Sequence, residues 1–273
     1  MQAKTMEMPV RVSLLAIALA LALPGTASAE QVAQVKSPDG RIEVQLDLNG
    51  EGRLAYRVLR DGKPVLKDSR LGFIFRNGRQ LLRNLALDKQ AQRSADSTWE
   101  QPWGERRFVR DHYNELRAGF VEKDGDHRRF DMVFRVFDDG IGFRYDVPAQ
   151  PALREAQIVQ ELTEFAVARP ATAWWIPALE WNREEYLYHR TPLSEVAVVQ
   201  TPITLRTEDG LHLSIHEAAL VDYAGMNLMR GGDGELRALL TPGSPAPVVR
   251  RTPFATPWRT ITISERAGGL VES

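Results

Sequence analysis

The chain has 273 residues, a formal net charge of −1 and no cysteine, so disulfides and thiolate metal sites are excluded. Its length suits one large domain or two small ones, and a hydrophobic content of 43% is enough to build a core. The near-zero net charge argues against a nucleic-acid-binding protein, because such a protein needs a basic face to neutralise phosphates.

Residues 1–29 have the pattern of a secretory signal peptide. Basic residues precede an apolar run at 12–23, and 27–29 is a small-x-small cleavage sequence. The apolar run is too short for a helix that spans a bilayer, which needs roughly 20 residues. We therefore predict cleavage after Ala29, a single mature domain at 30–273, and export to the periplasm or exterior of a bacterium with no membrane association afterwards.

Short runs of alternating apolar and polar residues predict β-strands throughout the mature chain. Turn sequences such as Asn49-Gly50 and Asp61-Gly62 separate these runs, and X-Gly turns of this kind are a strong hairpin signal. Strands are expected at 41–48, 54–59, 71–75, 115–120, 129–137, 141–147, 196–199, 203–206, 211–215, 235–240 and 258–263. No helical pattern of useful length is present, so the sequence predicts an all-β sandwich or barrel with little helix.

The segment from Trp174 to Leu193 has no strand period and is unusually rich in aromatic and acidic residues. Long ordered loops of this kind often carry function. The flat rings of tryptophan and tyrosine can pack against sugar rings, which makes the stretch from Trp174 to Tyr188 a candidate carbohydrate platform. The competing interpretation is that these rings serve core and loop packing, where large aromatic side chains contribute most.

His212, near the start of the 211–215 strand, and His216, directly after its end, suggest metal chemistry. A zincin motif would need a second histidine four residues after His216, but that position is Leu220. His212 and His216 lie four residues apart on a strand, which separates them by roughly 13 Å, too far to share one small metal ion. The carboxylate of Glu217, which follows directly, must be solvated, paired or bound to a ligand.

Pairs of acidic residues are frequent in the sequence, but their positions are unfavourable for the two-carboxylate chemistry of glycosidases. Glycosidases need two carboxyl groups that face each other across the scissile bond. The pairs at 138–139 and 184–185 are sequence neighbours, which point to opposite faces of a strand, and 138–140 is typical of a turn. Glu161 and Glu164 form another nearby pair. No catalytic residue is assigned in this chain.

Several groups of residues follow one another in a specific order and spacing along the mature chain. They are Ser37-Pro38-Asp39-Gly40, Trp103-Gly104-Glu105, His112-Tyr113-Asn114-Glu115-Leu116, 134–145, Thr163-Glu164-Phe165, Ala173-Trp174-Trp175-Ile176-Pro177, 216–223, and Thr256-Pro257-Trp258-Arg259-Thr260. In this order and spacing they resemble the N-terminal region of glycoside hydrolase family 97, the bacterial α-glucosidase and α-galactosidase group.

The resemblance implies a large antiparallel β-super-sandwich similar to the mutarotase-like sandwiches. In that family a (β/α)₈ catalytic barrel follows, and it carries the catalytic carboxylates. A calcium ion in the active site is held by glutamates, one of which comes from the N-terminal domain. Glu217 is the position that matches this ligand, and carboxylate oxygens are ligands that calcium prefers.

From the resemblance we expect a non-catalytic N-terminal domain, or a fragment, of an exported calcium-dependent α-glycosidase. The domain would support the barrel, lend Glu217 to Ca²⁺, and form part of the pocket for an α-glucoside or α-galactoside; its substrate-binding residues stay unassigned. A barrel takes about 250 residues and does not fit within 30–273, so the chain alone is expected to be inactive and its calcium site incomplete. The alternatives are a stand-alone carbohydrate-binding module and a periplasmic interaction scaffold.

Overall fold

The computed structural model describes residues 29–180, 185–232 and 234–273. Apart from Ala29, the predicted signal peptide at 1–29 lies outside these residues. Within them, no helix is long and apolar enough to cross a membrane. Strands dominate, and the regular helical segments are η1 (Pro151–Leu153), η2 (Leu193–Glu195) and α1 (Gly269–Glu272).

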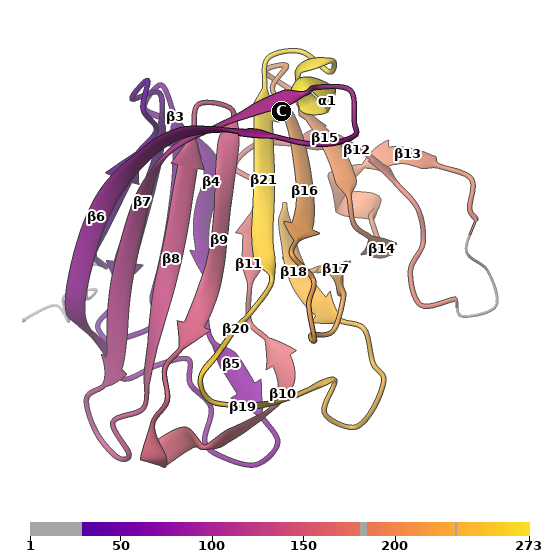
Figure 1. The fold of residues 1–273 in the computed structure, drawn as a ribbon. Coiled ribbons are helices and arrows are strands. Elements are labelled where there is room, and N and C mark those ends of the chain that lie inside the picture. Colours follow the sequence, from indigo (N-terminus) through magenta and orange to yellow (C-terminus); the bar gives the residue numbers. More distant parts are fainter. Residues whose placement is uncertain (1–28, 181–184, 233) are drawn as a thin grey trace, which may run out of the picture.

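One large antiparallel sheet of ten strands forms the framework (Figure 1). Its strands follow in the order β13 (His189–Pro192), β12 (Ala171–Trp175), β15 (Ile203–Thr207), β16 (His212–Ala218), β21 (Trp258–Ser264), β9 (Gly140–Val147), β8 (Arg129–Phe137), β7 (Phe108–Glu122) and β6 (Leu85–Glu100), with β20 (Phe254–Ala255) paired to β9.

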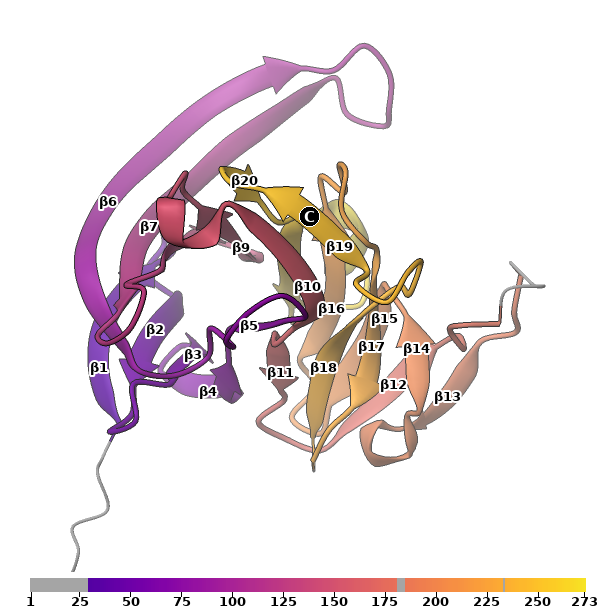
Figure 2. The same ribbon diagram turned by 90° about the horizontal axis from the view of Figure 1, so that it is seen from below.

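Three smaller sheets lie together on one side of the large sheet (Figure 2). The first contains β1 (Glu30–Lys36), β2 (Ile42–Leu48), β3 (Leu54–Arg60) and β4 (Lys63–Arg70). The second contains β19 (Val248–Arg251), β10 (Glu155–Glu161) and β5 (Phe73–Phe75). The third contains β11 (Glu164–Ala166), β18 (Glu235–Leu240), β17 (Met226–Arg230) and β14 (Val198–Gln200). We call the opposite side of the large sheet its outer face.

Aromatic side chains join the layers at the centre of the core. Tyr56 of β3 packs against Phe143 of β9 and Phe134 of β8, with ring centroids 4.9 and 5.8 Å apart. All three side chains are fully buried. Phe134 and Phe143 share the inward face of the large sheet because side chains alternate along a strand, and Tyr56 packs against them from one of the smaller sheets. The predicted all-β sandwich is confirmed.

The boundaries of β8 match the expected strand at 129–137, and β9 begins one residue before the expected 141–147. The alternation pattern of the sequence does not predict β6, although this strand has 16 residues. Nearly all of β6 is exposed, so it lacks the alternation that burial of one face produces. A strand at the edge of a sheet, exposed on both faces, gives no such signal.

The β6–β7 hairpin extends beyond the rest of the sheet. Strand β8 stops pairing with β7 at Asn114, whereas β6 and β7 remain paired as far as Glu100 and Phe108. Residues 95–113 therefore form a two-stranded ribbon without a third strand. This ribbon bends across the outer face, in front of the ends of β21, β16 and β15 (Figures 1 and 2).

Candidate functional site around buried Arg259

Glu217 and Arg259 lie directly opposite each other on neighbouring strands of the large sheet. Strand β16 pairs with β21 so that Glu217 faces Arg259 across the ladder. Arg259 shares the inward face of β21 with the buried Ile261 and Ile263. Its guanidinium is therefore directed into the core, where its side chain has no solvent exposure.

Arg259 binds two carboxylates from different parts of the fold. Its Nε and Nη2 donate to Oε1 and Oε2 of Glu161 at 2.9 and 2.7 Å. Its Nη1 donates to Oε2 of Glu217 at 2.6 Å. Glu161 ends β10 in one of the smaller sheets, so the guanidinium connects that sheet to two strands of the large one. The paired contact with Glu161 has the two-pronged geometry that makes arginine–carboxylate interactions specific.

Hydroxyl groups satisfy the remaining acceptors of Glu161. Thr163 Oγ1 donates to Oε1 at 2.8 Å, and the Tyr223 hydroxyl donates to Oε2 at 3.0 Å. Because the Thr163 proton is used in this way, Tyr145 donates its own hydroxyl proton to Thr163 Oγ1, 3.0 Å away. The result is a connected polar network inside an otherwise apolar core, which we call the Arg259 network.

The network keeps both partners of the central pair ionised. Complete burial acts to raise the pKa of Glu161, but the charge and hydrogen bonds of Arg259, with those of Thr163 and Tyr223, outweigh it and lower this pKa below its ordinary 4.5. Burial also acts to lower the pKa of Arg259, and Glu161 reverses that effect, so its pKa is raised. Burial raises the pKa of Tyr223 as well, which keeps this donor protonated.

Glu217, the predicted calcium ligand, already has protein partners on both carboxylate oxygens. Oε2 accepts from Arg259, and Oε1 accepts from the backbone N–H of Met226 at 2.9 Å. The side chain is 9% exposed. Calcium needs six to eight oxygen ligands, and within the described ranges no group of three or more His, Asp or Glu residues could hold a metal ion. The residues around Glu217 therefore do not fit a calcium site by themselves, and the guanidinium beside it would repel a cation.

Of the other candidate residues from the sequence, Glu161 belongs to the Arg259 network, whereas His212, His216 and Glu164 do not. His212 and His216 lie on β16 as expected, with His216 exposed. Glu161 and Glu164 are both buried in arginine pairs, Glu164 with Arg70. Neither acid is free to act on a substrate.

The loop between Trp174 and Tyr188 is only partly described, because residues 181–184 lie outside the described ranges; Trp181 and Glu184 are among them. Trp175 is mostly buried and stacks on His189, with ring centroids 4.7 Å apart. Tyr188 is 68% exposed. The described part of the loop therefore combines a packing role with an exposed ring.

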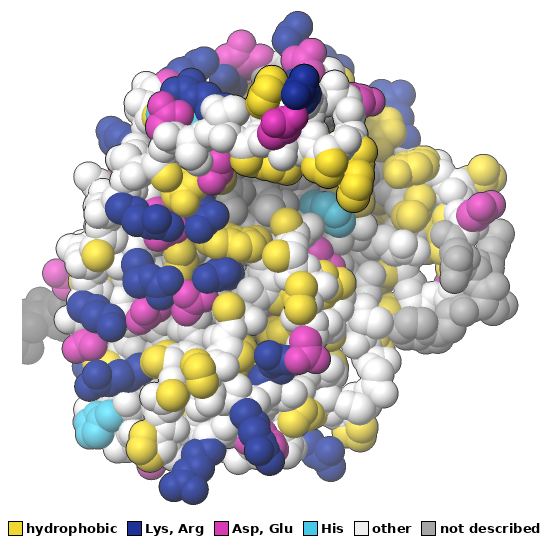
Figure 3. Space-filling model, viewed as in Figure 1, with side chains coloured by type: hydrophobic (Ala, Val, Ile, Leu, Met, Phe, Trp, Pro, Cys, Tyr) yellow, Lys and Arg dark blue, Asp and Glu magenta, His cyan; other side chains and the backbone are white. Residues whose placement is uncertain are grey.

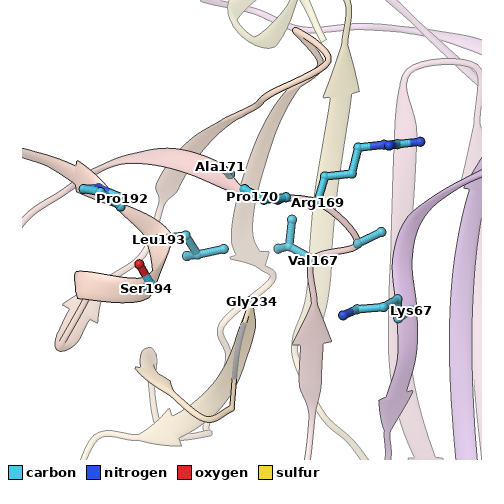
Figure 4. A pocket seen from close by; sticks show the side chains of 10 residues that line it. Lys67, Val167, Arg169, Pro170, Ala171, Pro192, Leu193, Ser194 and Gly234 are labelled. Atoms are coloured by element: carbon cyan, nitrogen blue, oxygen red, sulfur yellow. The ribbon is translucent and has the colours of Figure 1, made fainter.

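A cavity of about 350 Å³ lies between β4, the 167–171 segment and η2 (Figure 4). Lys67 and Arg169 lie on one side of it, and Leu193 and Ser194 lie on the other. Its lining contains no carboxylate, so this cavity cannot act as a two-carboxylate glycosidase site.

Sequence reasoning missed Arg259, Glu161 and Tyr223 as members of one site. A signal for Arg259 was present, because the alternation of β21 places it on the same face as Ile261 and Ile263. A charged residue on a core face requires a buried partner. The identity of that partner depends on β10, about 100 positions earlier in the chain, and no local pattern reveals it.

The sequence matches the family described as Glycosyl-hydrolase 97 N-terminal over residues 35–273. The chain belongs to this family. It is 29% identical over 270 residues to the probable retaining alpha-galactosidase of Streptomyces bingchenggensis strain BCW-1, a match that covers 93% of this chain and 40% of that protein. A retaining alpha-galactosidase of Bacteroides thetaiotaomicron is 25% identical over 206 residues, covering 70% of this chain and 29% of that protein.

Solved structures give the same result for this family 97 domain. A Glycoside Hydrolase Family 97 enzyme from Pseudoalteromonas sp. strain K8, in complex with acarbose, superposes with a TM-score of 0.85 and 44% identity. That match covers 88% of this chain and 37% of the other. A beta-arabinopyranosidase shares the fold, with a TM-score of 0.77 and 24% identity. The chain thus spans about 40% or less of the length of these relatives.

We expect Glu161→Gln to destabilise the domain by about 3–5 kcal/mol at pH 7, because it leaves the buried Arg259 charge without its main partner. The wild-type pair contributes fully above pH 4.5, the ordinary pKa of the Glu161 carboxyl, and this contribution is lost as the pH falls through the lower folded-state value. Urea unfolding at pH 7 and at pH 3.5 measures both effects. The acid sensitivity should be smaller in the variant than in the wild type.

Glu105→Gln, which changes an exposed acid, serves as the control and should leave stability unchanged. Equal stability of Glu161→Gln and the wild type at pH 7 would show that the Arg259 network does not hold the layers together.

Proposed function

We propose that this domain is the non-catalytic N-terminal part of a family 97 α-glycosidase, where it supports a (β/α)₈ catalytic barrel. The observation that carries the proposal is the family match over residues 35–273, together with relatives that extend far beyond the matched region. Relatives are named as alpha-galactosidases, and the family 97 enzyme from Pseudoalteromonas sp. strain K8 has been solved in complex with acarbose and, as a variant, with panose. An α-galactoside or α-glucoside is therefore the substrate class that we propose for the whole enzyme.

The Arg259 network supports a structural role for the domain. It is fully paired and buried, which suits a group that fixes strand positions rather than one that exchanges protons with a substrate. Leu220 and Val221 follow Glu217 in the loop that Tyr223 anchors, and they are 47% and 74% exposed. The network thus holds an apolar loop at the end of β16, where a neighbouring domain could contact it.

The purified chain should show no turnover of aryl α-glucosides or α-galactosides, because Glu161 and Glu164 are held in buried arginine pairs and the cavity between β4 and η2 has no carboxylate in its lining. Release of p-nitrophenol from both substrates, followed over hours at high protein concentration, measures this. A family 97 enzyme that contains its barrel is the positive control. Turnover that survives further purification would contradict the supporting role.

We propose that Glu217 contributes to a calcium site only together with ligands from the rest of the enzyme. The family resemblance assigns Glu217 to the ion, but its present partners mean that a calcium site would need other ligands from outside the described residues. The chain alone should therefore bind Ca²⁺ weakly or not at all, as measured by calorimetric titration of the calcium-free protein. Tight binding that Glu217→Gln leaves intact would place the site elsewhere in the chain.

We also propose that the protein is exported. The support is the sequence of residues 1–29, with its short apolar run and small-x-small end. When the full sequence is expressed in a bacterium, the mature protein should be recovered outside the cytoplasm with Glu30 as its first residue. Intact-mass measurement and N-terminal sequencing test this, and an unprocessed cytoplasmic product would contradict it.

A further inference from the structure

The outer face of the large sheet is divided into two regions of different chemistry. Over β7, β8 and β9 it carries ion pairs, in which Arg117 binds Asp131 and Asp146 at 3.0 and 2.7 Å. Arg144 also pairs with Asp146. Over β15, β16 and β21 the central positions of this face carry small hydroxyl side chains instead.

These hydroxyls form a row across adjacent strands. Ser214 of β16 lies directly opposite Thr204 of β15 and Thr262 of β21. On the next pair of outward positions, His216 lies opposite Thr260. The residues between them, such as Ile215, are buried, so the hydroxyls and the imidazole point to the outer face.

The four hydroxyls make no side-chain hydrogen bond to any described residue. They are half-buried rather than fully solvated. The row therefore offers directional donors and acceptors without a formal charge. Trp174 continues the same row beyond Thr204, in the neighbouring strand β12.

We call the outward-facing positions of β15, β16 and β21 the floor. The β6–β7 ribbon passes over this floor. Its register places Trp99 opposite Val109, with no irregularity between residues 89 and 100. Val109 lies an even number of residues from Arg117, whose side chain is on the outer face, so Val109 and Trp99 lie on the side of the ribbon that continues this face. Because the ribbon bends over that face, this side is turned toward the floor. Hydrophobic side chains gather on the underside of the ribbon, above a hollow in which a histidine is visible (Figure 3).

Exposed aromatic rings on an unsupported ribbon are costly unless a ligand or partner covers them. Trp99 is 51% exposed, and Trp103 at the tip is 83% exposed. A two-stranded ribbon is marginally stable by itself, and large exposed apolar groups commonly mark binding surfaces. A partner is thus expected in the space between the ribbon and the floor.

We propose that this space, which we call the ribbon groove, binds a neutral oligosaccharide. A flat indole ring covers the apolar face of a sugar ring, while the hydroxyls and His216 hydrogen-bond to sugar hydroxyls. Thr204, Ser214 and Thr262 carry no charge, and the charge that follows in this direction is that of Arg190, which lies over the Trp174 ring at the end of the row. The uncharged hydroxyls favour a neutral polyhydroxylated ligand over an anionic one. The groove shares Trp174 of β12 with the 174–188 stretch but does not include the rest of that loop. It goes beyond the supporting role proposed above and does not depend on it.

The chain offers a matched pair of variants on the same ribbon. Phe108 is 59% exposed, but it lies opposite Glu100 and so on the other side of the ribbon from Trp99. Trp99→Ala should weaken binding of maltotriose or raffinose at least about tenfold, because it removes the stacking ring. Phe108→Ala removes a similarly exposed ring and should leave the affinity unchanged. Calorimetric titration, with circular dichroism to verify folding, measures both.

Two further variants locate the ligand. Ser214→Arg places a large side chain in the middle of the hydroxyl row, where it should occupy the groove and abolish binding. Tyr188→Ala changes the 174–188 loop and should leave the affinity unchanged. Affinity should be the same at low and high salt, because the ligand is uncharged.

Several results would overturn the proposal. They are the absence of binding to either trisaccharide by the folded chain, loss of affinity in Tyr188→Ala but not in Trp99→Ala, and equal losses in Trp99→Ala and Phe108→Ala. A ribbon variant that changes only the oligomeric state, measured by light scattering, would show that the ribbon contacts protein instead.

Discussion

The buried pairing of Arg259 with Glu161 and Glu217 is the constraint on which the arrangement of this domain depends. A guanidinium in a core is tolerated only if its charge and its donors are satisfied, and here two carboxylates from separate sheets do so. A slip of β21 by one residue would turn Arg259 to the outer face and Thr260 into the core. Glu161 would then be a buried charge without a partner, so the network selects one register.

The same network changes the interpretation of Glu217. Position in the chain and family resemblance assign it to a metal ion, whereas its contacts show an acid that anchors Arg259 and the N–H of Met226. A fully bonded carboxylate is a rigid element of the scaffold. In the enzyme that we propose, the end of β16 would thus present a fixed surface rather than a mobile ligand.

Much of the fold could be predicted from local sequence pattern, because a strand with one buried face alternates apolar and polar residues. The strands β8 and β9 show this most clearly, since Phe134 and Phe143 occupy their inward positions. Strand β6 could not be found in this way, because an exposed edge strand has no buried face. The Arg259 network could not be assembled either, because its partners are far apart in sequence and meet only through sheet packing.

The two edges of the ten-stranded sheet have a consequence for behaviour in concentrated solution. Strand β13 has only four residues and ends at Pro192, which lacks the N–H that a further strand would need. Strand β6 is long but carries Asp88, Lys89, Arg93 and Asp96 along its exposed edge. Short strands, proline and charged side chains are the features that prevent edge-to-edge aggregation. We therefore expect that neither edge of the large sheet pairs with strands of other molecules, so the protein should not grow into fibres through this sheet.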